Sequence, residues 1–228
     1  MTPNSQWDVL EDAAAVAREG ARRVLAAAKR AIDERGLFRI VLAGGRTPQA
    51  MHRLLSEAAA DWGRWHIYFG DERCLPADDN ERNSRAAALV WLDRVPIPTE
   101  NVHAIPAELG AEAAAAIYRP AVAAALPFDL VTLGMGEDGH TASLFPGQEH
   151  PAEELVHAVH QAPKPPPDRV SLGFDALSRA RETLLLVTGA SKRPAISAWR
   201  EGERLPIARV GGGSPVQVLL DRDAAGDL

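Results

Sequence analysis

The sequence predicts an α/β fold built on a mostly parallel sheet covered by helices. Short apolar, branched runs alternate with longer segments of helical periodicity, many of them alanine-rich. Several runs end at glycines directly before a helix start, as expected where crossover helices join parallel strands. With 228 residues, 46% of them hydrophobic, the chain can bury a sizeable core. One domain spanning residues 1–228 is therefore expected.

The first elements predicted are a helix, a strand, a turn and a second helix. Apolar residues recur at helical spacing over 8–35, and Gly36 closes that segment. The run 38–43 is a predicted strand that ends in the tight turn Gly44-Gly45. Thr47 and Pro48 fit the N-cap and first position of the next helix, which continues through Leu55.

The rest of the chain repeats this alternation. Further strands are predicted at 65–69, 102–105, 128–133, 183–188, 207–210 and 216–220. Further helices are predicted at 83–92, at 108–125 and after the Gly189 turn. Periodicity weakens from residue 150 to 168, where four prolines clustered at 163–167 indicate a surface excursion rather than a domain linker.

Composition limits the partners and the compartment. A net charge of -6 without a basic run argues against a nucleic-acid surface, although isolated cations could hold a small anion. Cys74 is the only cysteine, which excludes an internal disulfide framework. No basic leader or membrane-length apolar segment is seen, so a cytoplasmic protein with no membrane contact is expected. A monomer is expected because no coiled-coil seam is visible, with a dimer as the alternative.

The most informative segment follows the predicted strand 128–133. It reads Gly134-Met135-Gly136-Glu137-Asp138-Gly139-His140-Thr141-Ala142-Ser143-Leu144-Phe145-Pro146. In open α/β sheets, ligands bind beyond the carboxyl ends of strands, which is where His140 is expected. His140 could take a proton from water near neutral pH, and Asp138 could orient its imidazole. The alternative is a capping or packing histidine in an ordered loop.

The same loop has the glycine spacing of a dinucleotide site. Gly134, Gly136 and Gly139 follow a strand, but Pro146-Gly147 would stop the long helix that such a site needs. The ribose-binding acid expected about twenty residues later is also missing. Neither a nicotinamide nor any other cofactor is expected.

Three cationic positions at strand ends indicate an anionic ligand. Gly44-Gly45-Arg46-Thr47 joins a strand to a helix N-terminus, which favours phosphate, and the missing Walker lysine favours a sugar phosphate. Lys192 follows the Gly189 turn in a similar position. Arg73 ends another strand, where Asp71 and Glu72 could orient its guanidinium toward phosphate or a developing oxyanion. The alternatives are a simple glycine turn, solvated cations and local ion pairing.

Other reactive arrangements have less support. No Gly-x-Ser-x-Gly elbow occurs, and a lone Cys74 is more often a small buried hydrophobe. Between residues 150 and 160, histidines and glutamates could supply metal ligands, but HExxH is absent and the spacing also fits a hydrated polar helix. No metal is expected.

With these segments placed, the chain resembles the 6-phosphogluconolactonase family across most of its length. The resemblance is carried by residues 42–48, 70–73 and 133–146, with further similarity at 83–85, 169–172, 188–192 and 205–210. It implies a single-domain, Rossmann-like fold with helices on both faces. The implied activity is hydrolysis of 6-phospho-D-glucono-1,5-lactone to 6-phospho-D-gluconate in the oxidative pentose phosphate pathway.

The resemblance also implies roles for the residues already singled out. His140 would be the general base, oriented by Asp138, and Arg73 would serve the oxyanion or the phosphate. The substrate-binding candidates are Gly44, Gly45, Arg46, Thr47, Asp71, Gly139 and Lys192. Many relatives have serine where this chain has Arg46, so the phosphate contact at that position is expected to differ.

Two other functions remain open at this point. A glucosamine-6-phosphate deaminase-like isomerase shares the fold, but its loop resembles Gly-His-Ile-Ala-Phe-Asn-Glu-Pro, whereas here Thr141-Ala142-Ser143-Leu144-Phe145-Pro146 follows His140. A non-catalytic sugar-phosphate sensor would need an output surface, such as an appended helix-turn-helix domain. The first predicted helix leads almost directly into the first strand, which leaves no room for such a domain.

Overall fold

The computed structural model describes residues 5–211 and 214–226. Its main feature is a seven-stranded parallel sheet. The strand order is β1-β10-β9-β6-β2-β3-β5, and every neighbouring pair is parallel. The strands are β1 (Ser5–Leu10), β2 (Phe38–Leu42), β3 (Trp65–Phe69), β5 (Val102–His103), β6 (Phe128–Gly134), β9 (Ala180–Val187) and β10 (Val216–Asp221). The predicted α/β class and mostly parallel sheet are confirmed.

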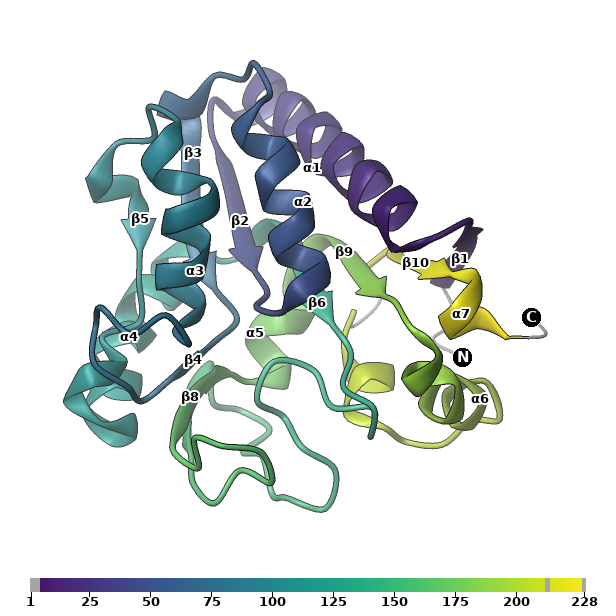
Figure 1. Ribbon diagram of the computed structural model, residues 1–228. Coiled ribbons are helices and arrows are strands. Elements are labelled where there is room, and N and C mark those ends of the chain that lie inside the picture. Colours follow the sequence, from purple (N-terminus) through teal and green to yellow (C-terminus); the bar gives the residue numbers. More distant parts are fainter. Residues whose placement is uncertain (1–4, 212–213, 227–228) are drawn as a thin grey trace.

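Helices cover both faces of this sheet (Figure 1). One face carries α1 (Ala13–Arg35), α2 (Arg46–Ser56) and α3 (Asn83–Val90), and the other carries α4 (Ala111–Ala125) and α5 (Phe174–Ser178). The strand order reverses direction after β5, and right-handed crossovers then place α4 and α5 on the opposite face. The short helices α6 (Arg193–Arg200) and α7 (Arg222–Ala225) lie near the β10 edge. In the described part of the chain, no helix is long and apolar enough to cross a membrane.

The central strand β6 shows why the covered sheet is stable. Its first six residues are buried, because helices cover the sheet on both faces. Its two buried polar residues have partners: Asp129 accepts from the Arg39 amide at 2.8 Å, and Thr132 donates to the Val41 carbonyl at 2.8 Å. Pairing these groups avoids the cost of an unsatisfied polar atom in the core.

A second, antiparallel sheet continues from the carboxyl edge of the first. Its order is β4 (Asp71–Arg73), β8 (Arg169–Leu172), β7 (Val156–Val159). The chain passes from β3 to β4 at Gly70, whose amide donates to Leu42 of the main sheet at 3.0 Å. The Gly70 carbonyl accepts from the Leu172 amide of β8 at 2.8 Å, so this residue joins both sheets.

Two predicted helix starts were wrong. Residues 8–10 belong to β1 rather than to the first helix, because residues 5–10 pair with β10, and long-range pairing outweighs local propensity. Asp12 instead caps α1, accepting from the Ala15 amide at 2.7 Å. Helix α2 begins at Arg46 rather than after Thr47, because Gly45, at φ 101°, already acts as the N-cap residue.

Two later predictions also need correction. The expected strand 207–210 is a 3-10 turn, Pro206–Arg209, whose Ile207 amide donates to the Gly139 carbonyl at 3.1 Å. This segment therefore supports the His140 loop instead of joining a sheet. The polar helix considered for residues 150–160 is not formed, because β7 lies there and buries His157.

Candidate active site

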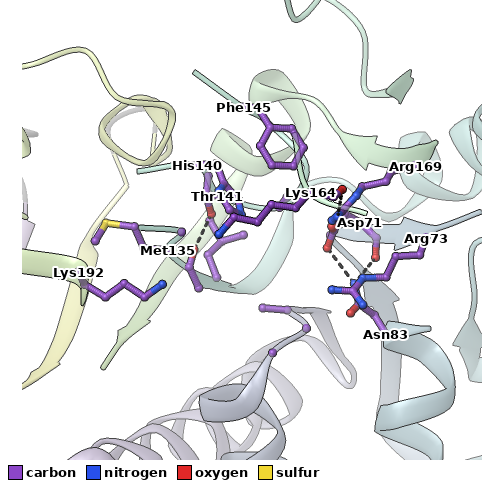
Figure 2. A pocket seen from close by; sticks show the side chains of 18 of the residues that line it. Asp71, Arg73, Asn83, Met135, His140, Thr141, Phe145, Lys164, Arg169 and Lys192 are labelled. Carbon is purple, nitrogen blue, oxygen red and sulfur yellow. Dashed lines mark hydrogen bonds between the residues drawn. The ribbon is translucent and has the colours of Figure 1, made fainter. Parts of the chain in front are cut away.

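Four strands of the main sheet end at a cleft of about 330 Å³, whose opposite side is the small sheet. Gly44 follows β2, Gly70 follows β3, the His140 loop follows β6, and Lys192 follows β9. Six of the predicted site residues line this cleft: Gly44, Gly45, Asp71, Arg73, His140 and Lys192. The close-up in Figure 2 shows His140 between Lys192 on one side and Arg73 on the other.

His140 and Asp138 form a hydrogen-bonded pair. Asp138 Oδ1 lies 2.5 Å from His140 Nδ1 and also accepts from the His140 amide at 3.2 Å. The pair lies against Gly136: a Cβ added there would fall 2.0 Å from His140 Nδ1 and 2.6 Å from the Asp138 carboxylate. Glycine at position 136 is therefore required by the pair itself, beyond any role in the turn.

The environment sets the protonation state of both partners. Burial lowers the pKa of His140 below its ordinary value, although the Asp138 carboxylate opposes this shift, so the imidazole is neutral at neutral pH. Burial acts to raise the pKa of Asp138, but its interactions with His140 outweigh this, and the net pKa is lowered. An ionised Asp138 can only accept a hydrogen bond, so the neutral ring carries its proton on Nδ1. Nε2 is then the free base.

The tail of the loop fastens His140 in place. The Thr141 hydroxyl donates to the Gly134 carbonyl at 2.9 Å, and the Gly136 amide donates to the His140 carbonyl at 2.8 Å. The Phe145 ring centroid lies 4.6 Å from that of His140. Ser143 is buried and donates to Asp71 Oδ2 at 2.6 Å, which ties the loop to the small sheet.

Asp71 and Glu72 build the opposite side of the cleft. Asp71 uses both carboxylate oxygens on protein donors, accepting from Ser143 and, at 3.0 Å, from Asn83 Nδ2. Glu72 is fully buried and accepts from three amides, those of Arg73, Asn83 and Ser84. These two carboxylates therefore hold the start of α3 against β4.

Arg73 is positioned by its neighbours while remaining in the cleft lining. Its Nη1 donates to the Glu81 carbonyl at 2.8 Å. Its Nε is buried and has no hydrogen-bond partner among the described residues. Because Arg73 lines the cleft, its guanidinium can bind an anionic oxygen there.

The glycine turn and Lys192 form the other side. A Cβ at Gly44 would fall 1.9 Å from Asn83 Oδ1, so the turn can approach α3 only with glycine at that position. Burial lowers the pKa of Lys192. Arg46 and Thr47 line an adjoining pocket of about 590 Å³, which shares Gly44, Gly45 and Lys192 with the cleft. Thr47 shares a 2.6 Å hydrogen bond with Thr188.

Gly139 contributes to the loop in a different way from the other predicted ligands. Its amide donates to the Gly136 carbonyl at 3.1 Å. Its φ of 80° favours glycine, and an added Cβ would fall 2.7 Å from Leu205. Its observed contacts therefore shape the loop.

Sequence reasoning missed several residues that line the cleft. Those with larger or polar side chains include Asn83, Thr141, Phe145, Lys164 and Arg169. All but Lys164 lie in segments of the family resemblance, which would have been a usable signal. Lys164 lies in the proline-rich excursion, which the sequence presents only as a surface loop.

The residues considered for a metal or a thiol have other surroundings. In residues 5–211 and 214–226, no group of three or more His, Cys, Asp or Glu side chains is arranged to hold a metal ion. His150 and His157 instead share a 3.2 Å hydrogen bond. Cys74 packs against the core, and burial raises the pKa of its thiol to about 11, which disfavours the reactive thiolate.

Comparisons with known proteins agree with the geometry. The 6-phosphogluconolactonases of Mycobacterium tuberculosis and Streptomyces coelicolor are each 38% identical to this chain. The first alignment covers 99% of this chain and 99% of the Mycobacterium protein, and the second covers 100% of this chain and 96% of the Streptomyces protein. The crystal structure of 6-phosphogluconolactonase from Thermotoga maritima superimposes with a TM-score of 0.89 at 30% identity, over 95% of this chain and 99% of that one. The family described as glucosamine-6-phosphate isomerases/6-phosphogluconolactonase matches residues 11–219, and the chain belongs to this family.

Proposed function

We propose that this protein hydrolyses 6-phospho-D-glucono-1,5-lactone to 6-phospho-D-gluconate, as a step of the oxidative pentose phosphate pathway. The observation that carries the proposal is the His140–Asp138 pair, whose free Nε2 belongs to a cleft lined by four cationic side chains. The 38% identity to named 6-phosphogluconolactonases over nearly the whole chain supports the choice of substrate.

In the proposed reaction, His140 Nε2 takes a proton from water as its oxygen attacks the lactone carbonyl carbon. The imidazolium that forms is stabilised by the Asp138 carboxylate at 2.5 Å. The tetrahedral intermediate then collapses, the ring C–O bond breaks, and the leaving alkoxide takes a proton from the imidazolium. Water is consumed, one ester bond is lost, and no acyl-enzyme forms.

Cationic groups on the two sides of the cleft are assigned to the two negative charges of the substrate, the developing oxyanion and the phosphate. Arg73 lines the cleft and is assigned to the developing oxyanion. Lys192 and the Gly44-Gly45 turn, at the N-terminus of α2, are assigned to the phosphate. Asp71 and Gly139 support these groups through their protein contacts, while Arg46 and Thr47 extend the phosphate side into the adjoining pocket.

The test is hydrolysis of fresh 6-phospho-D-glucono-1,5-lactone in excess of the spontaneous rate, with a chelator present and His140→Ala as control. Hydrolysis by the wild type that persists with the chelator and is lost in the variant is the expected result. No excess hydrolysis by folded wild type would reject the proposal. Ammonia release from glucosamine 6-phosphate would support the isomerase alternative, and tight sugar-phosphate binding without turnover would support a sensor.

We further propose that the protein works as a cytoplasmic monomer of one domain, independent of nucleic acid. Its large exposed apolar residues among those described are dispersed over several elements: Val9, Leu89, Leu109 and Ile117. Isolated residues of this kind do not form an association patch. Light scattering should give a mass near 24.5 kDa at all concentrations, and denaturation should show one transition. A concentration-independent dimer mass would contradict the monomer.

A further inference from the structure

A proline-rich strap borders the cleft and places a lysine near His140. This strap, residues 160–168, connects β7 to β8, and its Lys164 and Pro165 line the cleft. Its base is fastened by His160, which contacts Asp168 at 2.8 Å and Glu112 of α4 at 3.2 Å. These contacts restrain the strap and therefore the backbone position of Lys164.

Arg169 fastens the tip of the strap. Its Nη2 donates to the carbonyls of Lys164 and Pro165, at 2.9 and 3.1 Å, and its Nε donates to the Pro166 carbonyl at 3.1 Å. Its guanidinium also lies 5.5 Å from the centre of the Phe145 ring, which packs on His140. Because these donors are used on the strap, Arg169 positions Lys164 relative to the catalytic loop.

The Lys164 ammonium has only a weak counterion. Its Nζ lies 3.8 Å from the Glu137 carboxylate, which is an ion pair without a hydrogen bond, and the two side chains are 49% and 58% exposed. Lys192 extends toward Lys164 from the opposite side of the same opening (Figure 2). The positive charge of Lys164 adds to the effect of burial in lowering the pKa of Lys192, while Glu137 acts in the opposite direction.

Two lysine ammonium groups that face one opening repel each other, and an anion between them offsets this repulsion. Glu137 neutralises one charge at long range, whereas a phosphate dianion could accept charge-assisted hydrogen bonds from both ammonium groups. We propose that Lys164 and Lys192 bind the substrate phosphate as a pair, and that Glu137 is the internal counterion which the phosphate displaces. This proposal rests on the proposed lactone hydrolysis and adds Lys164 to its substrate site, with Glu137 as the group that the substrate displaces.

The arrangement favours the phosphate over the reacting carbonyl as the ligand of Lys164. Lys192 belongs with the glycine turn at the start of α2, an anion-binding position. Arg73, which is assigned to the oxyanion, lies across His140 from Lys192 (Figure 2). Lys164 thus serves the end of the substrate that does not react.

The test compares Lys164→Ala with Lys29→Ala, a matched change at an exposed lysine of α1. Steady-state kinetics are measured with the phosphorylated lactone and with unphosphorylated D-glucono-1,5-lactone. Lys164→Ala should raise KM for the phosphorylated substrate by about 10- to 100-fold with kcat little changed, the size of a lost hydrogen bond to a charged group. It should leave kcat/KM for the unphosphorylated lactone unchanged, and Lys29→Ala should resemble the wild type on both.

Calorimetric titration with 6-phospho-D-gluconate separates this proposal from the proposed function, because binding needs no turnover. Lys164→Ala should weaken binding by a similar factor, and Glu137→Gln should tighten it several-fold by removing the competing carboxylate. Equal binding by Lys164→Ala and Lys29→Ala would overturn the proposal even in an active lactonase. An equal loss of kcat on both lactones would also overturn it, placing Lys164 at the carbonyl. If the wild type binds but does not hydrolyse, only the proposed function fails.

Discussion

The two sheets contribute to the cleft in different ways. The seven-stranded parallel sheet contributes through its strand ends, where glycine-rich turns present His140, Lys192 and the Gly44-Gly45 turn. The three-stranded antiparallel sheet contributes Asp71, Arg73 and Arg169, which are largely engaged with other protein groups. The first sheet therefore presents the base and the phosphate ligands, and the second mainly fixes where they lie, although its Arg73 is also assigned to the oxyanion.

This difference follows from the physical character of each sheet. Inner strands of the parallel sheet, such as β6, are buried on both faces, and in sheets of this kind ligands bind beyond the carboxyl ends of the strands. The small sheet carries charges within its strands, and each buried charge needs partners: Glu72 has three amides and Arg82, at 3.4 Å. Substitutions in the two sheets should accordingly have different consequences, with turnover affected in one and stability in the other.

The largest effect is expected at the end of the parallel sheet. His140→Ala should lower kcat by about 10²- to 10⁴-fold, because it removes the general base, while the folded structure remains. His66→Ala is the matched control, since His66 stacks on His103 and lies near the amino end of β3, away from the cleft. Near-normal turnover in His140→Ala would remove the base assignment.

The next effect concerns the small sheet and should appear in stability. Glu72→Ala should lower the free energy of unfolding by about 3 kcal/mol or more, because three amides lose their acceptor and buried Arg82 loses a counterion. Urea denaturation measures this loss. Glu154→Ala, at an exposed pair with Arg119, should cost less than about 1 kcal/mol. Equal stabilities for the two variants would show that the buried network does not support the cleft.

A smaller effect on kcat is expected within the His140 loop, where it tests the role of Asp138. Asp138→Asn should lower kcat by about 10- to 100-fold, the value of a hydrogen bond to a charged group, because the imidazolium loses its carboxylate. The variant should also move the acidic limb of the rate profile to lower pH, since the Asp138 carboxylate raises the pKa of His140. A limb shifted to higher pH would mean that Asp138 does not act on this ring.

The smallest effect is a pH dependence of the free energy of unfolding, which comes from one buried histidine beside each sheet. Burial lowers the pKa of His52 on α2 to about 3 and that of His157 on β7 to about 4, from 6.5. Their neutral forms stabilise the fold fully above pH 6.5, and this contribution is lost as pH falls, because the unfolded chain binds the protons first. The loss is up to about 1.4 kcal/mol per pH unit for each group.

Denaturation at pH 7 and pH 5 tests this prediction with His52→Phe and His157→Gln, each of which should flatten the pH dependence. His160→Gln is the control of opposite sign. Hydrogen bonds to Asp168 and Glu112 raise the pKa of His160, so its contribution is present at low pH and lost as pH rises. The same slope in all three variants would contradict the assigned buried states.

How much of this arrangement is predictable depends on the range of the interactions involved. The strands ending near Gly44, Gly70 and His140 were predicted because an apolar run followed by glycine is a local signal. The strand β4 has three charged residues and pairs Asp71 with Ser171, one hundred positions away, so no local pattern indicates it. The same holds for β1, whose residues 8–10 continue the local helical pattern and form a strand only through pairing with β10.

The sequence by itself determined the α/β class and the position of His140 with Asp138 and Gly136, because periodicity and closely spaced residues carry those properties. Only the tertiary structure decided that Ser143 and Asn83 bind Asp71, and that Arg169 holds Lys164 over the cleft. Ser143 and Asp71 are 72 positions apart in the chain. Arg169 and Lys164 are close in sequence, but their place beside the His140 loop depends on how the small sheet packs against the main sheet. Local preference therefore specified the reactive loop, and long-range packing specified the charges around it.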